Sequence, residues 1–241
     1  MSWASIRRGE VDGVPVHIKT TTYDARLEAE GLATLAGAGA PVPEVISVDE
    51  HRLVLRSVTG PPAWRFLGAA VARAHRATAD TFGWHRDNVI GSLPQHNDRH
   101  EDWPTFYIER RLRPWMPSLP TAVRHRLDDL CTGLLPELLD HDASPSLLHG
   151  DLWSGNVVEG AWLIAPAVHY GDRELDLAFA TVFGGIPAEF FDGYREEWPL
   201  DPAWERRRPA LQLYHLLVHV ELFGRSYVPM IAARLDMLEG A

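Results

Sequence analysis

The sequence predicts an α+β protein with a small strand-rich part, residues 1–59, and a larger helical part, residues 60–241. Alternating apolar and polar residues, the pattern of half-buried strands, occur mainly in the first part. Gly60-Pro61-Pro62 then interrupts the chain with residues that neither helices nor strands favour. Beyond this break, apolar residues recur mostly at helical spacing, which indicates a helical second part.

The first part begins with a turn at Asp12-Gly13, a dipeptide that favours tight hairpin turns. A strand follows this turn because Val14, Val16 and Ile18 alternate along the chain. Asp24 can cap a helix, since its side chain can accept hydrogen bonds from the first helical turn. The further elements expected here are that helix, over 26–35, and strands over 45–48 and 53–58.

The second part contains a segment with little periodicity, residues 82–104, which is rich in Gly, Pro, Asn, His and Trp. Such a composition predicts a long functional loop. One short hairpin is expected between Asn156 and Ile164. Helices are predicted over 67–78, 103–112, 120–140, 174–184, 188–197 and 203–223.

The composition excludes several classes of protein. The 241 residues include 23 Lys and Arg against 33 Asp and Glu, which gives a net charge of −10. Nucleic acids and anionic membranes attract basic surfaces, so we expect neither as a partner. No apolar run approaches the roughly 20 residues of a membrane span. The single cysteine, Cys131, and the lack of an apolar leader after Met1 predict a cytoplasmic protein.

The strongest chemical signal is His149-Gly150-Asp151, followed by Asn156. This His-x-Asp-x-x-x-x-Asn spacing is that of a kinase catalytic loop, in which the Asp accepts the substrate hydroxyl proton and the Asn holds Mg²⁺. Phosphoryl transfer needs both groups, because its catalysis is mostly positioning and charge neutralisation. The alternative is a structural turn in which the His and Asp side chains only cap the backbone.

A second signal lies in the strand-rich part. Lys19 ends the expected strand, and Glu28 and Glu30 lie on the helix that follows. In kinases, a strand lysine paired with a helix glutamate holds the ATP phosphates. An exposed edge lysine and acidic residues near a helix N-terminus would explain these residues equally well one by one. The order of strand lysine, helix glutamate, break, helical part and His-x-Asp loop favours the kinase interpretation.

Together these motifs resemble the fructosamine kinase (ketosamine-3-kinase) family, within the aminoglycoside-phosphotransferase-like kinases. The Trp153-Ser154 pair in the catalytic loop separates this family from the antibiotic kinases. The resemblance covers the chain from about Val14 and implies a bilobal protein-kinase-like fold and an ATP-dependent small-molecule kinase. Further blocks similar to the family's are 166–178, the insertion over 82–107, and 213–227.

The resemblance also implies roles for individual residues. Asp151 would be the catalytic base and Asn156 a Mg²⁺ ligand. Lys19 would hold the ATP phosphates, with Glu28 as its ion-pair partner. The acceptor would be a ketosamine, an amine carrying a fructosyl or ribulosyl group, phosphorylated on the sugar 3-hydroxyl in protein deglycation. The hinge that holds adenine would lie at Arg56, Ser57 and Val58.

Substrate contacts are expected from aromatic, histidine and acidic side chains. Trp153 and Tyr214 could stack on the sugar or the amine, and packing alone is an equal alternative. Glu174 could meet the substrate amine or only complement a helix dipole. His219, four residues after His215, fits a pocket wall better than a zinc site. The full expected set is His149, Trp153, Tyr170, Glu174, Tyr214 and His219.

Two features depart from the family pattern. The family's Asp-Pro-Ala block reads Ala165-Pro166-Ala167 here, so a methyl group stands where the main Mg²⁺ carboxylate is expected. Alanine offers no oxygen to a cation that prefers about six oxygen ligands. The family also has a further strand pair and a phosphate-covering loop before the lysine strand, whereas only 18 residues precede Lys19. We therefore expect either a truncated N-terminal lobe or weak covering of the nucleotide.

These departures leave three functions open. The first is a ketosamine kinase that an introduced or recent change at Ala165 has impaired. The second is a catalytically inactive, pseudokinase-type protein that still binds its ligands. The third is a kinase for another small alcohol or an aminoglycoside. The otherwise intact site favours the first function, and the short N-terminus favours the second.

Overall fold

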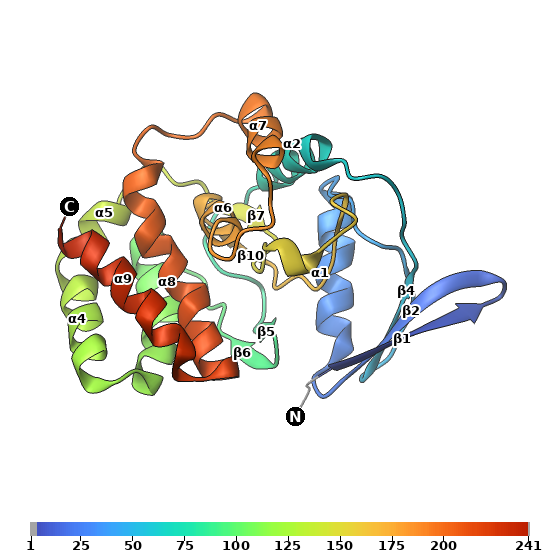
Figure 1. Cartoon of the computed structure of the whole chain (residues 1–241), viewed down its shortest axis with the longest axis horizontal. Helices are drawn as coiled ribbons and strands as arrows, with labels where there is room; N and C mark the ends of the chain where they lie inside the picture. The colour runs from blue at the N-terminus through green and yellow to red at the C-terminus, as the bar shows by residue number, and fades with distance from the viewer. Residues whose placement is uncertain (1–3, 241) are drawn as a thin grey trace.

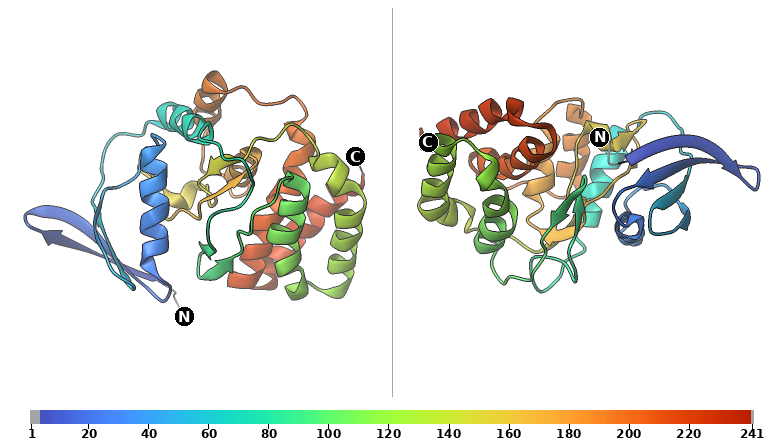
Figure 2. Two further views of the ribbon diagram at one scale, coloured as in Figure 1. Left: turned by 180° about the vertical axis from the view of Figure 1, so that it is seen from behind. Right: turned by 90° about the horizontal axis from the view of Figure 1, so that it is seen from below.

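The computed structural model describes residues 4–240, which adopt a kinase-like α+β fold (Figure 1). An antiparallel sheet of four strands, in the order β1-β2-β4-β3, forms the N-terminal part together with one helix. Further views place this blue sheet at one end of the molecule and the green and red helices at the other (Figure 2). The bounds are β1 (Ala4–Val11), β2 (Val14–Thr21), α1 (Ala25–Gly37), β3 (Val45–Val48) and β4 (Arg52–Arg56).

The hairpin between β1 and β2 has the predicted turn at Asp12-Gly13. Both residues have positive φ angles, 49° and 78°, as a tight hairpin turn requires. The pattern does not predict β1, because most side chains of this edge strand are exposed and do not alternate in polarity. β1 nevertheless pairs with β2 over its whole length, so the lysine strand lies inside the sheet.

Helix α1 begins where the sequence predicts. Asp24 is its N-cap, and the Asp24 side chain accepts a hydrogen bond from the Arg26 backbone N–H at 3.0 Å. The buried face of α1 packs on β4, with Leu32 against Leu53 and Leu55 in one apolar cluster. The helix therefore covers one face of the sheet beside β2.

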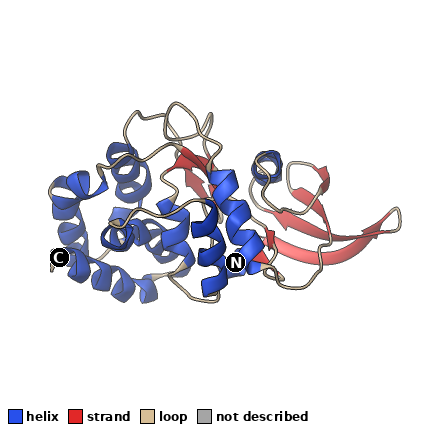
Figure 3. Cartoon of the chain, turned by 90° about the horizontal axis from the view of Figure 1, so that it is seen from above, coloured by secondary structure: helices blue, strands red, loops and turns tan. Residues whose placement is uncertain are grey.

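The helical part contains a close helix pair, α2 (Trp64–His75) and α7 (Ala188–Glu197). A Cβ atom on Gly68 would collide with the backbone of Phe190, and one on Gly193 with the backbone of Arg65. The two glycines thus allow the helix axes to approach. The longest helix, α8 (Trp204–Phe223), packs on α6 (Glu174–Ala180) and α9 (Val228–Glu239) within the larger core. Figure 3 shows the concentration of helices at this end.

Short strands hold the predicted catalytic loop. β7 (Ser146–Leu148) precedes the loop and pairs with β10 (His169–Gly171), while β8 (Val157–Val158) and β9 (Trp162–Leu163) form the predicted hairpin after it. A further hairpin, β5 (Asn88–Ile90) and β6 (Leu93–Gln95), lies within the segment predicted as a loop. The loop prediction was therefore wrong for these six residues, whose strands are too short to show a period.

Several helix boundaries differ from the predictions. The predicted helix over 120–140 is two helices, because the backbone departs from helical angles at Gly133 (φ −105°, ψ −88°). The predicted helix over 103–112 changes to π-helical geometry, and α6 ends before Gly184-Gly185. The expected elements do not include α9, β7 or β10. The bounds are α3 (Trp103–Phe106), η1 (Tyr107–Leu112), η2 (Arg113–Ser118), α4 (Thr121–Thr132), α5 (Leu134–Leu139), η3 (Ser154–Asn156) and η4 (Arg225–Tyr227).

The helix predicted over 67–78 lies three residues earlier in the structure, as α2. Strand β4 ends at Arg56, two residues before the end of the strand predicted over 53–58. The division between residues 1–59 and 60–241 stays a prediction, and residues 1–3 and 241 lie outside the described part. Between residues 4 and 240, none of the helices combines the length and the apolar character that crossing a membrane requires.

Candidate active site

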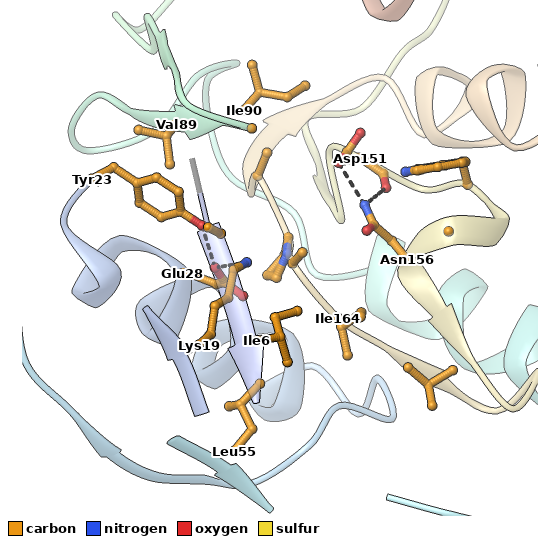
Figure 4. Close-up of a pocket in the computed structure, with 18 of the residues that line it drawn as sticks. Ile6, Lys19, Tyr23, Glu28, Leu55, Val89, Ile90, Asp151, Asn156 and Ile164 are labelled. Atoms are coloured by element: carbon orange, nitrogen blue, oxygen red, sulfur yellow. Dashed lines mark hydrogen bonds and ion pairs between the residues drawn. The ribbon is translucent and has the colours of Figure 1, made fainter. Parts of the chain in front are cut away.

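A cavity of about 480 Å³ lies between the sheet and the helical part. Figure 4 shows Lys19, Glu28 and Tyr23 on one side of it and Asp151 and Asn156 on another. Residues that are far apart in the sequence thus face one space. The wall combines β1, β2 and β4 with the β5–β6 hairpin, the catalytic loop, the segment after β9 and the end of α8.

A largely buried ion pair joins β2 to α1. The Nζ atom of Lys19 lies 2.6 Å from Oε2 of Glu28, and the two side chains are 14% and 5% exposed. The Tyr23 hydroxyl donates a hydrogen bond of 2.9 Å to the same carboxylate oxygen. Burial and the Glu28 charge raise the pKa of Tyr23, so this hydroxyl keeps its proton. Glu30, the other acidic residue of the helix, instead pairs with Arg86 and His85.

The catalytic loop brings Asp151 and Asn156 into direct contact. The Nδ2 atom of Asn156 donates to Oδ2 of Asp151 at 2.7 Å and to the Asp151 carbonyl oxygen at 2.8 Å. Burial raises the pKa of Asp151 to about 7, against the opposing effects of the Asn156 hydrogen bond and the Lys19 charge. A carboxyl group with this pKa can take up a proton near neutral pH.

The carboxylate of Asp176 binds the backbone of this loop. One carboxylate oxygen accepts from the His149 N–H at 2.7 Å and the other from the Gly150 N–H at 2.9 Å. The Nε2 atom of His75 lies 3.2 Å from Asp176 Oδ2. Burial opposes the ionisation of Asp176, but these partners outweigh it and lower its pKa. The carboxylate of Asp176 therefore fixes the backbone of this loop through both of its oxygens.

Ala165 lines the cavity in an unusual backbone conformation. Its φ angle is +51°, in the left-handed region where Asp, Asn and Gly are preferred over other residues. The preceding Ile164 carbonyl accepts a hydrogen bond from Nε2 of His149 at 3.0 Å. The backbone at this position therefore has a conformation that suits an aspartate better than the alanine present.

The other end of the cavity is apolar. Ile6, Leu55 and Ile164 lie together there in Figure 4, beside the predicted adenine hinge. Arg56 and Val58 of that hinge line the cavity. A flat, apolar ring fits between such side chains because burial of its faces removes apolar surface from water.

Five predicted site residues do not line the cavity. Both carboxylate oxygens of Glu174 bind Arg207, at 2.7 and 2.8 Å, and the pair is buried. The hydroxyl of Tyr214 is fully buried and donates to Oε1 of Gln95 at 2.6 Å. The prediction that Glu174 and Tyr214 contact the substrate is therefore corrected, because their polar atoms already have partners inside the core.

The other three residues also take part in packing or local hydrogen bonds. The neutral ring of His149 is buried between Asp151 N–H and Ile164 C=O, and burial lowers its pKa. Ser57 hydrogen-bonds His17, and its backbone N–H donates to Pro15. Tyr170 packs on Trp84 in a different depression. The predicted residues on the cavity wall are Lys19, Glu28, Arg56, Val58, Asp151, Trp153, Asn156, Ala165 and His219.

Several residues of the cavity wall are not among the predicted site residues. Tyr23 lies in a bend between a strand and a helix, and its spacing of five from Glu28 carries no recognised motif. Val89 and Ile90 belong to the hairpin read as a loop. Leu222 and Phe223 continue the helical pattern that contains His219, and one more turn of that helix could have pointed to them.

The expected metal ligands are incomplete. Asn156 can offer its amide oxygen, because its nitrogen makes both bonds to Asp151. Ala165 offers none, so the residues present fit a Mg²⁺ site only in part. His215 hydrogen-bonds the Gly150 carbonyl through Nε2 and does not act with His219 as a zinc pair. Elsewhere in residues 4–240, one possible ligand atom from each of His141, Asp172 and Glu174 lies within 4.8 Å of the others. Glu174, however, forms an ion pair with Arg207.

Comparisons with known proteins show which sequences this chain resembles. The sequence profile described as fructosamine kinase matches residues 14–239. A protein described as a ketoamine kinase from Lactiplantibacillus plantarum is 38% identical over 236 residues, covering 90% of this chain and 82% of the relative. A similarly described protein from Enterococcus faecium is 39% identical, covering 91% of this chain and 84% of the relative.

Solved structures give the same grouping. A crystal structure described as a fructosamine-3-kinase from Thermobifida fusca matches with a TM-score of 0.88 and 33% identity, over 99% of this chain and 93% of that one. A thermostable mutant of the aminoglycoside phosphotransferase APH(4)-Ia, solved with ADP and hygromycin B, matches with a TM-score of 0.64 and 15% identity. That match covers 99% of this chain and 89% of the other, and it shows the shared fold alone.

Proposed function

The chain belongs to the fructosamine kinase family, a family of phosphotransferases, and we propose that it transfers the γ-phosphoryl group of ATP to the 3-hydroxyl of a ketosamine. The observation that carries this proposal is the placement of Lys19 and Asp151 on one cavity from opposite sides. A cation for phosphates and a carboxylate for a hydroxyl are the two groups that phosphoryl transfer requires. The 3-phosphate adduct is unstable, so the reaction would serve deglycation in the cytoplasm.

The acceptor hydroxyl would bind at Asp151. Asn156 donates to Oδ2 of this carboxylate, which leaves Oδ1 to accept the hydroxyl proton. The hydroxyl oxygen would form its bond to the γ-phosphorus as the bond from that phosphorus to the bridging oxygen breaks and ADP leaves. Lys19 would place its remaining N–H donors on the phosphates while Glu28 fixes its position. Apolar side chains at the hinge end, including Leu55 and Ile164, would hold the adenine ring.

Mg²⁺ would supply charge neutralisation between the phosphates when it is bound. Asn156 is the residue of this chain that would hold it, and Ala165 stands where a second oxygen ligand is expected. We therefore expect slow transfer by the chain as written.

Incubation with ATP and a ribulosamine, followed by phosphorus NMR, tests the proposed function. Correlation of the phosphorus signal with the proton on carbon 3 identifies the product. Phosphate on another carbon would contradict the assigned hydroxyl.

A non-catalytic binding protein is the second candidate, and Ala165 is the observation that favours it. Thermal unfolding separates the two functions, because a ligand raises the unfolding temperature according to its affinity for the folded state. Stabilisation by ATP that depends on Mg²⁺ supports the kinase. Stabilisation by a ketosamine alone, with none by ATP, supports the binding protein.

An aminoglycoside is a poor match for the charge of the cavity. Among the described lining residues, the carboxylates are Asp151 and Glu28, and Lys19 neutralises the second of these. A polycation would lose its hydration without several anionic partners, which costs free energy. An acceptor with a single amine therefore suits this cavity better than an aminoglycoside does.

Replacement of Tyr23 by Phe should weaken ATP binding about tenfold. The hydroxyl donates to the oxygen of Glu28 that also binds Lys19, and hydrogen bonds to charged groups contribute about 1.5–3 kcal/mol. Its loss would release Glu28 and therefore misplace Lys19. Calorimetric titration with ATP and Mg²⁺ measures this change. An unchanged dissociation constant beside a lowered unfolding temperature would assign Tyr23 a purely structural role.

The rate of transfer should depend on the protonation of Asp151. Its pKa is raised to about 7, and only the deprotonated carboxylate can accept the hydroxyl proton. We expect kcat/KM to rise about tenfold per pH unit below pH 7 and to level off above it. Initial rates across this range, measured at saturating ATP, would show the bend. A rate that does not change below pH 7 would remove Asp151 from the role of base.

A further inference from the structure

One part of the cavity wall consists of apolar side chains from two separate elements. Val89 and Ile90 come from the β5–β6 hairpin, and Val218, Leu222 and Phe223 come from α8. We call these five residues the acceptor wall. In Figure 4, Val89 and Ile90 lie at the end of the cavity opposite Leu55. Phe223 lines the cavity and remains 49% exposed, so it presents a large apolar surface.

This end of the cavity carries no formal charge. The acceptor wall contains no acidic or basic residue, and the ring of His219, which also lines the cavity, lies 5.3 Å from that of Phe223. Burial lowers the pKa of His219, and its Nδ1 atom hydrogen-bonds the His215 carbonyl at 2.7 Å. The imidazole is therefore neutral at neutral pH. A charged group placed here would lose water without gaining a counter-ion.

The acceptor wall is held in place by close contacts. Gly91, in the turn between β5 and β6, has a φ of +61°, and a Cβ atom there would lie 2.8 Å from Leu222. The ring of His219 lies 5.3 Å from that of Phe223 and 5.1 Å from that of Tyr227. A preformed apolar surface binds an apolar group at little cost in ordering.

We propose that the amine of the ketosamine acceptor carries an apolar substituent, alkyl or aromatic, which packs against the acceptor wall. This inference rests on the proposed function. With the 3-hydroxyl at Asp151, the amine nitrogen is only a few bonds away, so its substituent must lie in the same cavity. In that arrangement ATP fills the part of the cavity beside the hinge and Lys19. The acceptor wall then remains available for the substituent.

Calorimetric titration of the full chain tests this proposal with three acceptors that share one sugar. They are the fructosyl adducts of benzylamine, ethanolamine and glycine, measured in the presence of a non-hydrolysable ATP analogue and Mg²⁺. We expect the benzylamine adduct to bind about tenfold more tightly than the ethanolamine adduct, because its ring buries apolar surface. The glycine adduct should bind most weakly, since its carboxylate meets no cation at the wall.

Two serine variants provide a matched comparison. Phe223→Ser should remove most of the preference for the benzylamine adduct and leave the affinity for the ethanolamine adduct within about twofold. Phe66→Ser alters a phenylalanine that is similarly exposed, at 59%, but lies outside this cavity, and should keep the preference. Equal affinities for the three adducts, or equal effects of both variants, would overturn the proposal of an apolar substituent. Neither result would contradict the proposed kinase function. Binding of the ATP analogue without any ketosamine would overturn the proposed acceptor itself.

Discussion

Replacement of Ala165 by Asp should raise the rate of phosphate transfer by at least about a hundredfold. A metal-ligating carboxylate stabilises transition-state charge by several kcal/mol, and about 1.4 kcal/mol corresponds to a factor of ten in rate. The backbone already suits the change, because the φ of +51° at this position is one that aspartate tolerates. Phosphorus NMR of both proteins with ATP and a ribulosamine measures the gain.

Ala165→Asn is the control for this experiment. Asparagine has nearly the shape of aspartate and tolerates the same φ, but it brings no negative charge. A gain with Asp and a much smaller gain with Asn would assign the effect to the carboxylate. Equal turnover by the Ala, Asn and Asp proteins would contradict a metal-ligand role for this position. No turnover by any of them would favour the binding protein.

The replacement of Asp176 by Ala should lower the free energy of unfolding by about 3–5 kcal/mol. The substitution would leave the N–H groups of His149 and Gly150 buried without an acceptor and would remove a partner of His75. The catalytic loop would lose its support at the same time, so transfer should fall as well. Urea unfolding followed by tryptophan fluorescence measures the stability change.

The pH dependence gives this prediction a second readout. The pKa of Asp176 is lowered below its ordinary value of 3.8 in the folded chain. Its contribution is therefore complete above pH 3.8 and is lost as the pH falls through the folded-state pKa. The difference between the two proteins should shrink below that pH. Asp98→Ala, which removes an exposed ion pair with Arg110, should change stability by less than about 1 kcal/mol.

Local sequence signals identified the residues whose chemistry defines a motif. The capping aspartate of α1, the Asp12-Gly13 turn and the spacing of Asp151 and Asn156 are each short-range patterns that involve only a few neighbouring residues. Lys19 and Glu28 could be paired because a strand followed by a helix places them on adjacent elements. The left-handed backbone at Ala165 could not be predicted, since alanine does not favour it.

Residues that depend on packing between distant segments were beyond sequence reasoning. Glu174 and Tyr214 have side chains that suit a polar substrate, and only the fold shows that Arg207 and Gln95 already satisfy them. The acceptor wall, conversely, consists of ordinary apolar residues. Nothing in a hairpin of three-residue strands distinguishes a cavity wall from core packing, and only their helical spacing from His219 could have pointed to Leu222 and Phe223.

The hydrogen bond from Tyr214 to Gln95 has a consequence for attempts to engineer this protein. Gln95 also donates to the Ala167 carbonyl at 3.1 Å, and Asn88 donates to the Val168 carbonyl at 2.8 Å. The β5–β6 hairpin is therefore anchored to the chain just after Ala165. A hairpin exchanged from another kinase to alter acceptor choice would also shift the backbone at this position. A design that changes the hairpin to alter acceptor choice must therefore also preserve the backbone at Ala165, and it should retain Asn88 and Gln95.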